Sequence, residues 1–149
     1  MGVKGKLIGS IEVKCGGHLI HDILHTNPRH ILNISPSKLS HFEMDHEGES
    51  LKIGSIVNWK YNDDGSEKDK TIKEVIEAID VEKKSITWKV IGGDVLELYN
   101  SLSIITSCEG EWTTCTFVYE KKTEDTSEPL VPFGLLLNVL KDIEAHHLK

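Results

Sequence analysis

The last stretch of the chain has the most regular alternation of apolar and polar residues, and it predicts a long amphipathic helix. After Pro132, apolar side chains recur at spacings of three and four residues, and polar side chains fall on the opposite side. Ser127 is expected as the N-cap and Glu128 as the negative charge of the first turn, where Pro129 and Pro132 are also tolerated. The apolar stripe consists of Phe133, Leu136, Leu137, Leu140, Ile143 and His147. A stripe of this kind packs on a solid core or covers a hollow.

The rest of the chain predicts one strand, two short helices and six further strands. Residues 3–14 have the pattern of a strand, and residues 17–25 and 28–33 have helical spacing. The later strands are expected at 37–44, 53–61, 70–80, 85–91, 96–107 and 112–121. Their connections are short, so neighbouring strands should pair antiparallel. We therefore predict one α+β domain over residues 1–149, a seven-stranded curved antiparallel sheet around the C-terminal helix.

Alternation along each strand separates an inward from an outward face. We place the bulkier, more aromatic face inward, and the final helix adds its own apolar side. Ala78, Thr113 and Ile143 point inward on this assignment. The inward residues expected to contact a ligand are Val57, Trp59, Tyr61, Ile72, Glu74, Ile76, Ile86, Trp88, Val90, Cys115, Phe117, Tyr119, Leu136, Val139 and Leu140. The same residues would fill a solid core in an ordinary sheet, and this alternative stays open.

Glu74 favours a pocket over a solid core. A buried carboxylate without a partner is costly and tends to have a raised pKa. A few polar groups in an apolar cleft are typical of a small-molecule site. We expect Glu74 to pair with Tyr61 or Tyr119, to orient a hydroxyl or amine of a ligand, or to lie at a wet mouth of the pocket.

Charge and cysteine content exclude several classes of partner. The 149 residues carry a formal net charge of −7, and Arg29 is the single arginine, which argues against nucleic acid and against anionic membranes. No apolar run approaches the roughly 18 residues of a membrane span, and the N-terminus lacks the hydrophobic core of a signal peptide. Cys15, Cys108 and Cys115 have no metal-type pair spacing and are expected as reduced thiols in a cytoplasmic protein.

Metal binding and nucleophilic catalysis have weak support in the sequence. His18, His21 and His25 fall near one face of the first short helix, with Asp22 adjacent. Structural zinc normally takes four close ligands, usually including cysteine, so we favour an exposed polar helix face and expect no metal. No serine lies in a nucleophile elbow, and no cysteine has an evident base near it in the sequence. We expect no cofactor, and a monomer or at most a weak dimer.

Several short motifs, by their order and spacing, resemble the plant major latex proteins of the birch-pollen-allergen (Bet v I-type, pathogenesis-related class ten) superfamily. They cover essentially the whole chain and comprise residues 5–7, 28–36, 46–48, 54–61, 77–80, 93–94, 118–121 and 142–148. The resemblance implies a helix-grip fold with a large apolar cavity that binds hydrophobic or amphipathic small molecules. It also implies a link to defence, stress or development, and a minority of such relatives are enzymes of alkaloid synthesis.

One turn departs from that family pattern. Birch-allergen relatives carry a glycine-rich, phosphate-loop-like segment where residues 46–54 lie. Here the turn keeps only Gly48 and Gly54, and it adds Glu47 and Glu49. Wrapping an anion with backbone amides needs several glycines, and the carboxylates would repel phosphate. The departure argues against nucleotide binding or ribonuclease activity.

We expect a cytoplasmic carrier or buffer for a hydrophobic plant metabolite, hormone or lipid. The alternative is an enzyme of specialised metabolism, with Glu74 as general base and Tyr61 or Tyr119 as acid. A third hypothesis, a protein-interaction module, predicts an exposed apolar patch around the short helices, at residues 24, 31 and 34.

The final helix is expected to hold the ligand in two ways. Leu136, Val139 and Leu140 should touch it, while Ile143 and Leu148 should seal the far end of the cavity. The glycine at 134 and the two prolines would let the first turns move, which makes that end a candidate gate.

Overall fold

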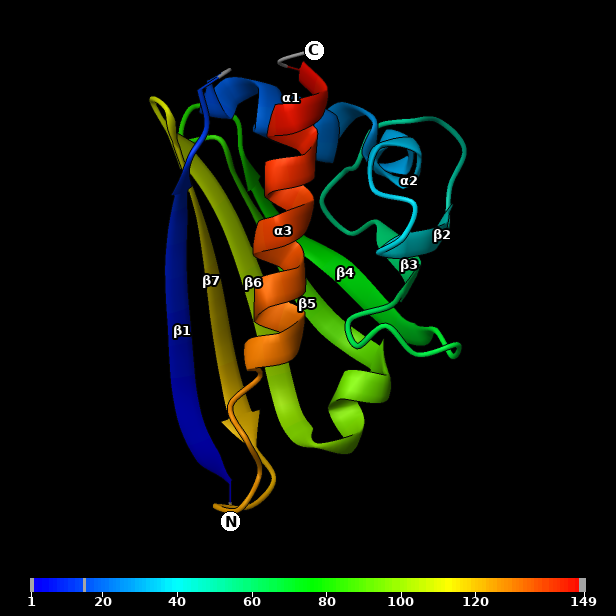
Figure 1. Cartoon of the computed structure of the whole chain (residues 1–149), viewed down its shortest axis with the longest axis vertical. Helices are drawn as coiled ribbons and strands as arrows, with labels where there is room; N and C mark the ends of the chain where they lie inside the picture. Colours follow the sequence, from blue (N-terminus) through cyan, green and yellow to red (C-terminus); the bar gives the residue numbers. More distant parts are fainter. Residues whose placement is uncertain (1, 15, 148–149) are drawn as a thin grey trace.

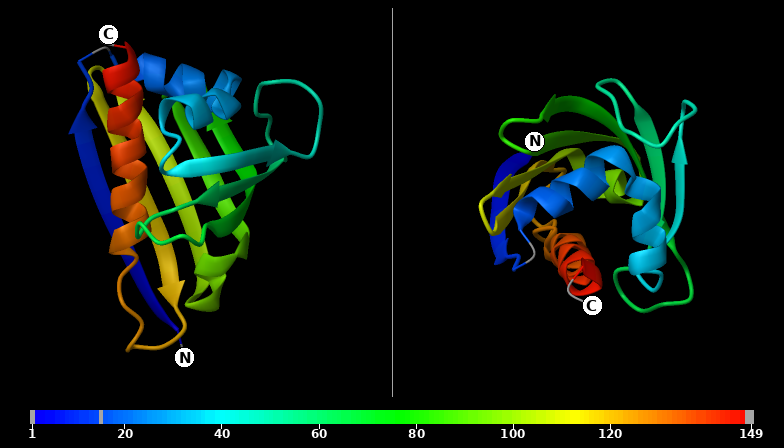
Figure 2. Two further views of the ribbon diagram at one scale, coloured as in Figure 1. Left: turned by 45° about the vertical axis from the view of Figure 1, so that its right-hand side comes forward. Right: turned by 90° about the horizontal axis from the view of Figure 1, so that it is seen from above.

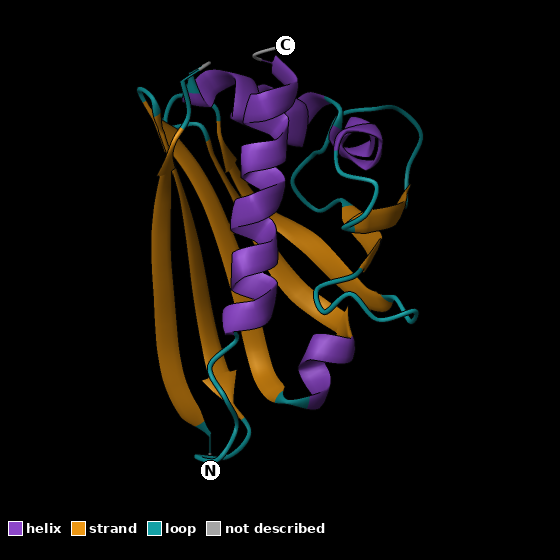
Figure 3. Cartoon of the chain, viewed as in Figure 1, coloured by secondary structure: helices purple, strands orange, loops and turns teal. Residues whose placement is uncertain are grey.

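The computed structural model describes residues 2–14 and 16–147, in which a seven-stranded antiparallel sheet curves around a long C-terminal helix (Figure 1). The helices are α1 (Gly17–Thr26), α2 (Ile31–Ile34) and α3 (Leu130–His147), with 3₁₀ turns η1 (Pro28–His30) and η2 (Asp94–Glu97). The strands are β1 (Val3–Glu12), β2 (Leu39–Met44), β3 (Ile56–Tyr61), β4 (Lys70–Asp80), β5 (Ser85–Gly93), β6 (Tyr99–Glu109) and β7 (Trp112–Lys121). The predicted α+β helix-grip fold is confirmed (Figure 3).

The strand order is β1-β7-β6-β5-β4-β3-β2, so the first strand pairs with the last. The ladder between β1 and β7 runs without a break from the pair Val3 and Lys121 to the pair Glu12 and Trp112. α1 and α2 connect the two edge strands, β1 and β2, and cross the open end of the curved sheet (Figure 2). The concave face of the sheet, the two short helices and α3 therefore surround one core.

Burial alternates along the strands and confirms the inward faces predicted for β3, β5 and β7. In β4 the alternation holds as far as Ile76 and then meets a bulge between Ile76 and Ala78. A bulge adds one residue to one strand and so exchanges the two faces beyond it. Ala78 is therefore exposed, contrary to the prediction, and Ile79 packs against the core in its place.

β3 begins at Ile56, later than the predicted start at residue 53. The Ser55 hydroxyl accepts a hydrogen bond from the Lys52 backbone N–H at 2.9 Å and closes a turn where a strand was expected. Ile53 lies outside the sheet as a result and is 67% exposed.

β6 begins at Tyr99 instead of residue 96, because the preceding residues form η2. The Asp94 carboxylate accepts a hydrogen bond from the Thr71 backbone N–H at 2.7 Å and holds this turn against β4. Val95, the residue before the predicted start of the strand, is buried on this turn. η2 therefore closes one end of the sheet with an apolar residue that points inward.

α3 begins at Leu130, so the predicted N-cap role of Ser127 is wrong. The Ser127 carbonyl accepts a hydrogen bond from the Tyr99 hydroxyl. The Glu128 carboxylate accepts one from the Tyr119 hydroxyl and another from a lysine of β7. Both residues are tied to the sheet before the helix starts, and the Glu128 carbonyl also accepts a hydrogen bond from the Leu130 backbone N–H at 2.8 Å.

The two halves of α3 are held differently. In the C-terminal half, the Asp142 carboxylate accepts hydrogen bonds from the Ser35 hydroxyl at 2.6 Å and from the Lys38 ammonium at 2.7 Å. Ile143 beside it is fully buried. In the N-terminal half, each of residues 132–137 is partly exposed. α3 is therefore fixed most firmly in its C-terminal half.

The last turn of α3 differs in part from what its pattern predicts. His147, expected on the apolar stripe, is exposed. Leu148, expected to seal the far end of the cavity, lies outside the described residues. No helix within residues 2–14 and 16–147 is both long and apolar enough to cross a membrane.

Candidate functional site

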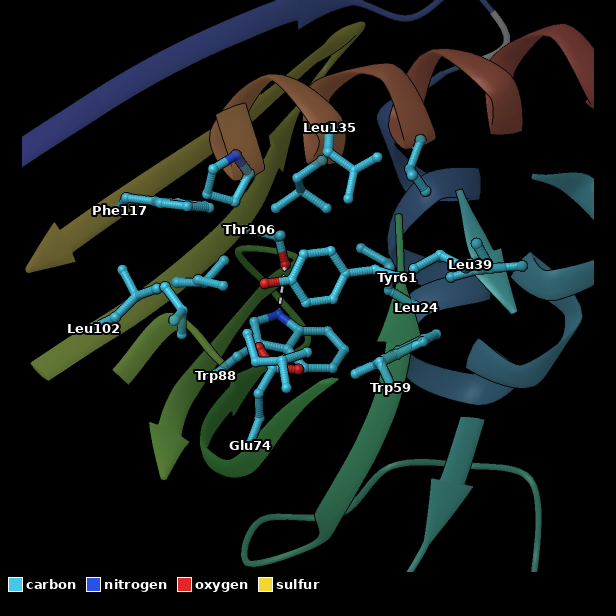
Figure 4. Close-up of a pocket in the computed structure, with 17 residues that line it drawn as sticks. Leu24, Leu39, Trp59, Tyr61, Glu74, Trp88, Leu102, Thr106, Phe117 and Leu135 are labelled. Atoms are coloured by element: carbon cyan, nitrogen blue, oxygen red, sulfur yellow. Dashed lines mark hydrogen bonds between the residues drawn. The ribbon is translucent and has the colours of Figure 1, made fainter. Parts of the chain in front are cut away.

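A cavity of about 110 Å³ lies between the concave face of the sheet and the N-terminal half of α3 (Figure 4). All three helices, η2 and strands β2 to β7 contribute to its wall. The lining residues are Leu24, Ile31, Leu39, Trp59, Tyr61, Ile72, Glu74, Trp88, Val95, Leu102, Ile104, Thr106, Phe117, Pro132, Leu135, Leu136 and Val139. Apolar and aromatic side chains dominate, and a small number of polar groups interrupt them, as in sites for small molecules.

Eight of the residues predicted to contact a ligand line this cavity. They are Trp59, Tyr61, Ile72, Glu74, Trp88, Phe117, Leu136 and Val139. The other seven are buried in the packed core away from the cavity wall: Val57, Ile76, Ile86, Val90, Cys115, Tyr119 and Leu140. Alternation identifies the inward face of a strand, but the hollow part of that face depends on its distance from the helix.

The sequence analysis missed nine lining residues. They are Leu24, Ile31, Leu39, Val95, Leu102, Ile104, Thr106, Pro132 and Leu135. In β6 the alternation of residues 102, 104 and 106 was available as a signal. The protein-interaction hypothesis predicts an exposed apolar patch around the short helices, but Leu24 and Ile31 are only 5% and 1% exposed. Their apolar faces cover the cavity instead, so the patch predicted by the protein-interaction hypothesis is absent at these two positions.

Glu74 is the acidic residue of the cavity wall and is 5% exposed. In the sheet it lies opposite Val57 of β3 and Val90 of β5, so its cross-strand neighbours are apolar. Burial raises the pKa of the Glu74 carboxyl to about 8, and a hydrogen bond from the Trp59 indole acts in the opposite direction. Glu74 therefore carries a proton at neutral pH most of the time while the cavity is empty.

The tryptophan on β5 is fixed by a buried hydrogen bond. Trp88 donates from its indole Nε1 to the Thr106 hydroxyl of β6 over 3.2 Å (Figure 4). This bond satisfies the polar edge of the ring and leaves its face toward the cavity. Trp88 is consequently a rigid part of the wall.

The two tyrosines proposed as partners of Glu74 occupy different places. Tyr61 lines the cavity, and burial raises the pKa of its hydroxyl above the usual value. In the ladder between β3 and β4, Tyr61 pairs with Lys70, four positions from Glu74. Tyr119 lies outside the cavity wall and its hydroxyl is bonded to Glu128. The suggested pairing of Glu74 with Tyr119 is therefore wrong.

The histidines of α1 do not form the exposed face that was predicted. His18 is exposed, but His21 is 4% exposed, and its Nε2 has no hydrogen-bond partner among the described residues. Burial, followed by the nearby His25, lowers the pKa of His21. Residues 2–14 and 16–147 hold no group of three or more His, Cys, Asp or Glu that could bind a metal ion.

The chain is similar to plant proteins over essentially its whole length. Residues 2–149 match the model of the pathogenesis-related protein Bet v 1 family. MLP-like protein 43 of Arabidopsis thaliana is 35% identical over 150 residues, which cover 97% of this chain and 93% of that protein. The crystal structure of ginseng major latex-like protein 151 from Panax ginseng is 38% identical and covers 99% of this chain, with a TM-score of 0.92 over 100% of that chain.

A more distant similarity concerns the fold alone. Norcoclaurine synthase from Thalictrum flavum, solved in complex with dopamine and hydroxybenzaldehyde, is 19% identical. Its structure aligns with a TM-score of 0.77 and covers 99% of this chain and 88% of that chain. The same architecture therefore occurs in an enzyme.

Proposed function

This chain belongs to the pathogenesis-related protein Bet v 1 family, and on that premise we propose that it binds a hydrophobic small molecule in the cavity beneath α3. The observation that carries the proposal is the unfilled space at the centre of the core, walled by Trp59, Trp88, Phe117 and the apolar side of the helix. A packed core normally leaves few voids larger than a water molecule. An apolar ligand in this space would recover the contacts that its lining lacks.

The size of the cavity limits what can enter without movement. An engineered apolar cavity of about 150 Å³ binds benzene, so about 110 Å³ suits a single ring or a short aliphatic chain. A larger ligand requires the first turns of α3 to move outward, where residues 132–137 are already partly exposed. Burial of about 300 Å² of ligand surface would contribute about 7.5 kcal/mol before the costs of association. The tightest binding that we expect has a dissociation constant near the micromolar range.

We place a carrier or buffer ahead of an enzyme. Acid–base catalysis needs two groups with suitable pKa values near the same reacting atoms. Glu74 has a pKa of about 8, but burial raises the pKa of the Tyr61 hydroxyl well above its usual value and makes it a weak acid. Among the residues that the structure describes, no Lys, Arg or His lines the cavity to serve in its place. An enzyme of specialised metabolism is the alternative, supported by Glu74 alone.

Tryptophan fluorescence offers a direct test. Trp59 and Trp88 line the cavity, whereas Trp112 is 52% exposed and would dilute the response. In the Trp112→Phe background, a neutral apolar compound such as an alkylbenzene should change the emission and displace an apolar dye. No change and no displacement across sterols, flavonoids, cytokinins and fatty acids would overturn the proposal.

Two substitutions on α3 separate the cavity from the surface. Leu136→Trp places a ring in the cavity and should abolish dye binding while the protein stays folded. Asn138→Trp adds the same ring at an exposed position two residues away and should leave dye binding unchanged. Equal dye binding by both variants would contradict the cavity as the binding site.

We further propose a monomer in the plant cytoplasm with a role in defence or stress. The thiols of Cys108 and Cys115 are free and buried, which suits a reducing compartment. Burial raises the pKa of both thiols, so neither is an activated nucleophile. Sedimentation of the purified protein tests the monomer, and localisation of a tagged chain in leaf cells tests the compartment.

A further inference from the structure

The carboxyl group of Glu74 lacks a cationic partner. Among the described residues that line the cavity, only Glu74 and Tyr61 are titratable, and no lysine, arginine or histidine is present. Lys89 of β5 lies on the outer face of the sheet, where it faces Glu77 at 3.9 Å. Neither an acid nor a base reaches the lining from the other elements around the cavity, which are α1, α2, β2, η2, β6, β7 and α3. Glu74 therefore faces an apolar space with most of its acceptor capacity unused.

Two tryptophans lie near this carboxyl group in the cavity wall. Figure 4 shows Glu74 together with Trp59 and Trp88, at the end of the cavity away from Leu135 of α3. The faces of tryptophan rings attract cations through their quadrupole, and more strongly when the cation is desolvated. A carboxylate beside aromatic rings is a combination that suits an ammonium group, because carboxylates and ring faces both attract cations.

We propose that the preferred ligands of this cavity are small apolar amines, whose nitrogen pairs with the Glu74 carboxylate while the ring or chain fills the space beneath α3. This inference rests on the proposed binding function and specifies its ligand class. A single ring suits the volume of about 110 Å³, and a ring with a short amine-bearing chain requires the first turns of α3 to move outward. A carboxylic acid is disfavoured, because it would place a second acidic group beside Glu74 without a base to compensate.

The proton balance of this binding step is definite. At neutral pH the free amine is a cation with a pKa of about 10, and Glu74 with a pKa of about 8 is mostly protonated. Pairing the ammonium with the carboxylate requires Glu74 to give up its proton to solvent. If Glu74 instead keeps its proton and pairs with the neutral amine, the released proton comes from the ligand. The number of protons released is the same in both cases. One proton leaves for each amine bound.

The pH dependence follows from the same two groups. Below about pH 8, affinity for the amine should rise close to tenfold for each pH unit, because each step increases the ionised fraction of Glu74. Between about pH 8 and pH 10 it should level off, and above that the amine loses its charge. Tyr61 does not contribute in this range, because burial and then the charges of Asp63, Asp94 and Glu74 raise the pKa of its hydroxyl.

The test uses 2-phenylethylamine and its neutral counterpart propylbenzene as probes. Calorimetric titrations of the full chain at pH 7, in two buffers of different ionisation enthalpy, should show release of nearly one proton per amine and none for propylbenzene. The amine should also bind at least tenfold more tightly at pH 8 than at pH 6.5. Absence of proton release, or equal amine affinity at the two pH values, would overturn the inference.

Two variants identify the group that loses the proton. Glu74→Gln keeps the shape and should abolish proton release and weaken amine binding at least tenfold, without weakening propylbenzene binding. Glu77→Gln, on the outer face of the same strand, should retain proton release. Because the wild-type titration already tests the inference, a Glu74→Gln protein that fails to fold does not leave it untested. If propylbenzene and an apolar dye bind but the amine does not, the amine class is wrong and the proposed function stands. If none of them enters, both are wrong.

Discussion

The backbone N–H of Lys14 donates a hydrogen bond to the Glu144 carboxylate over 2.5 Å, across a separation of 130 positions in the chain. The Lys141 ammonium bonds the same carboxylate and the Glu12 carbonyl, each at 3.1 Å. Glu144 thereby fastens the C-terminal half of α3 to the end of β1, while Asp142 fastens it to the segment before β2. These polar contacts hold the C-terminal half of the helix to both edges of the sheet, whereas residues 132–137 of its N-terminal half are partly exposed.

Glu144→Gln should lower the free energy of unfolding by about 1 kcal/mol at pH 7, because the Lys14 N–H loses a charged acceptor. The Lys14 N–H, followed by Lys141, lowers the pKa of Glu144 in the folded state. Its contribution is therefore complete above the unfolded value of about 4.5 and disappears as the pH falls through the folded value. Urea titrations from pH 3 to 7 measure it. Glu124→Gln, at an exposed position, is the control, and an equal loss there would contradict the role of Glu144.

Glu74→Gln should have the opposite dependence on pH. Burial raises the folded pKa of Glu74 to about 8 from a usual value of 4.5, so the wild type loses stability as the pH rises between these values. The free energy of unfolding of the variant should therefore exceed that of the wild type by an amount that grows by up to about 1.4 kcal/mol for each pH unit in this window. Above pH 8 the difference should stay constant. Glu77→Gln on the outer face of the same strand should show no such trend. A flat difference for Glu74→Gln would contradict the burial of an uncompensated carboxyl.

His21→Phe should protect the protein against mild acid. The folded pKa of His21 is lowered below 6.5, first by burial and then by His25, so protonation favours the unfolded chain. The free energy of unfolding of the wild type should therefore decrease as the pH drops below about 6.5. In the variant, the part of this decrease that His21 causes should be absent. His147→Phe, at an exposed position, should show the same decrease in stability at low pH as the wild type. Denaturant midpoints between pH 5 and 8 distinguish the two.

Gly93→Ala should destabilise the cavity end formed by η2. Gly93 has φ +106, and a Cβ there would overlap the Thr71 carbonyl oxygen of β4. Backbone strain and steric overlap together should cost about 3 kcal/mol. Gly65→Ala has φ +76 but open space around its Cβ, so it should cost only about 1 kcal/mol. Thermal unfolding of both variants measures the difference, and similar losses would contradict the overlap at Thr71.

Hydrogen exchange should divide α3 into two parts. Amides at 133–137 should exchange faster than those at 139–143, because the first group lies where the helix is partly exposed and the second where Val139, Leu140 and Ile143 are buried. A cavity ligand should slow exchange at 133–137 in particular. Uniform protection along the helix would argue against a gate at this end while leaving the fold unchanged.

The regular parts of the fold could be predicted because their periodicity is local. The inward residues of β3, β5 and β7 follow from alternation, and α3 follows from its three- and four-residue spacing. The errors arose where a contact with a distant residue overrides the local pattern. Ser127 is bonded by Tyr99 and does not cap α3, and Asp94 is bonded to Thr71 in a turn that delays the start of β6. The bulge at Ala78 left no trace in residue types.

The sequence alone determined the order of elements, the inward faces of the unbroken strands, the family and the unusual inward position of Glu74. The tertiary structure decided which buried residues surround empty space. A cavity depends on the distance between sheet and helix, and contacts such as that between Lys38 and Asp142 join residues far apart in the chain to set it. For this reason Trp59 and Leu140 look equivalent in the sequence, yet one lines the cavity and the other lies in packed core.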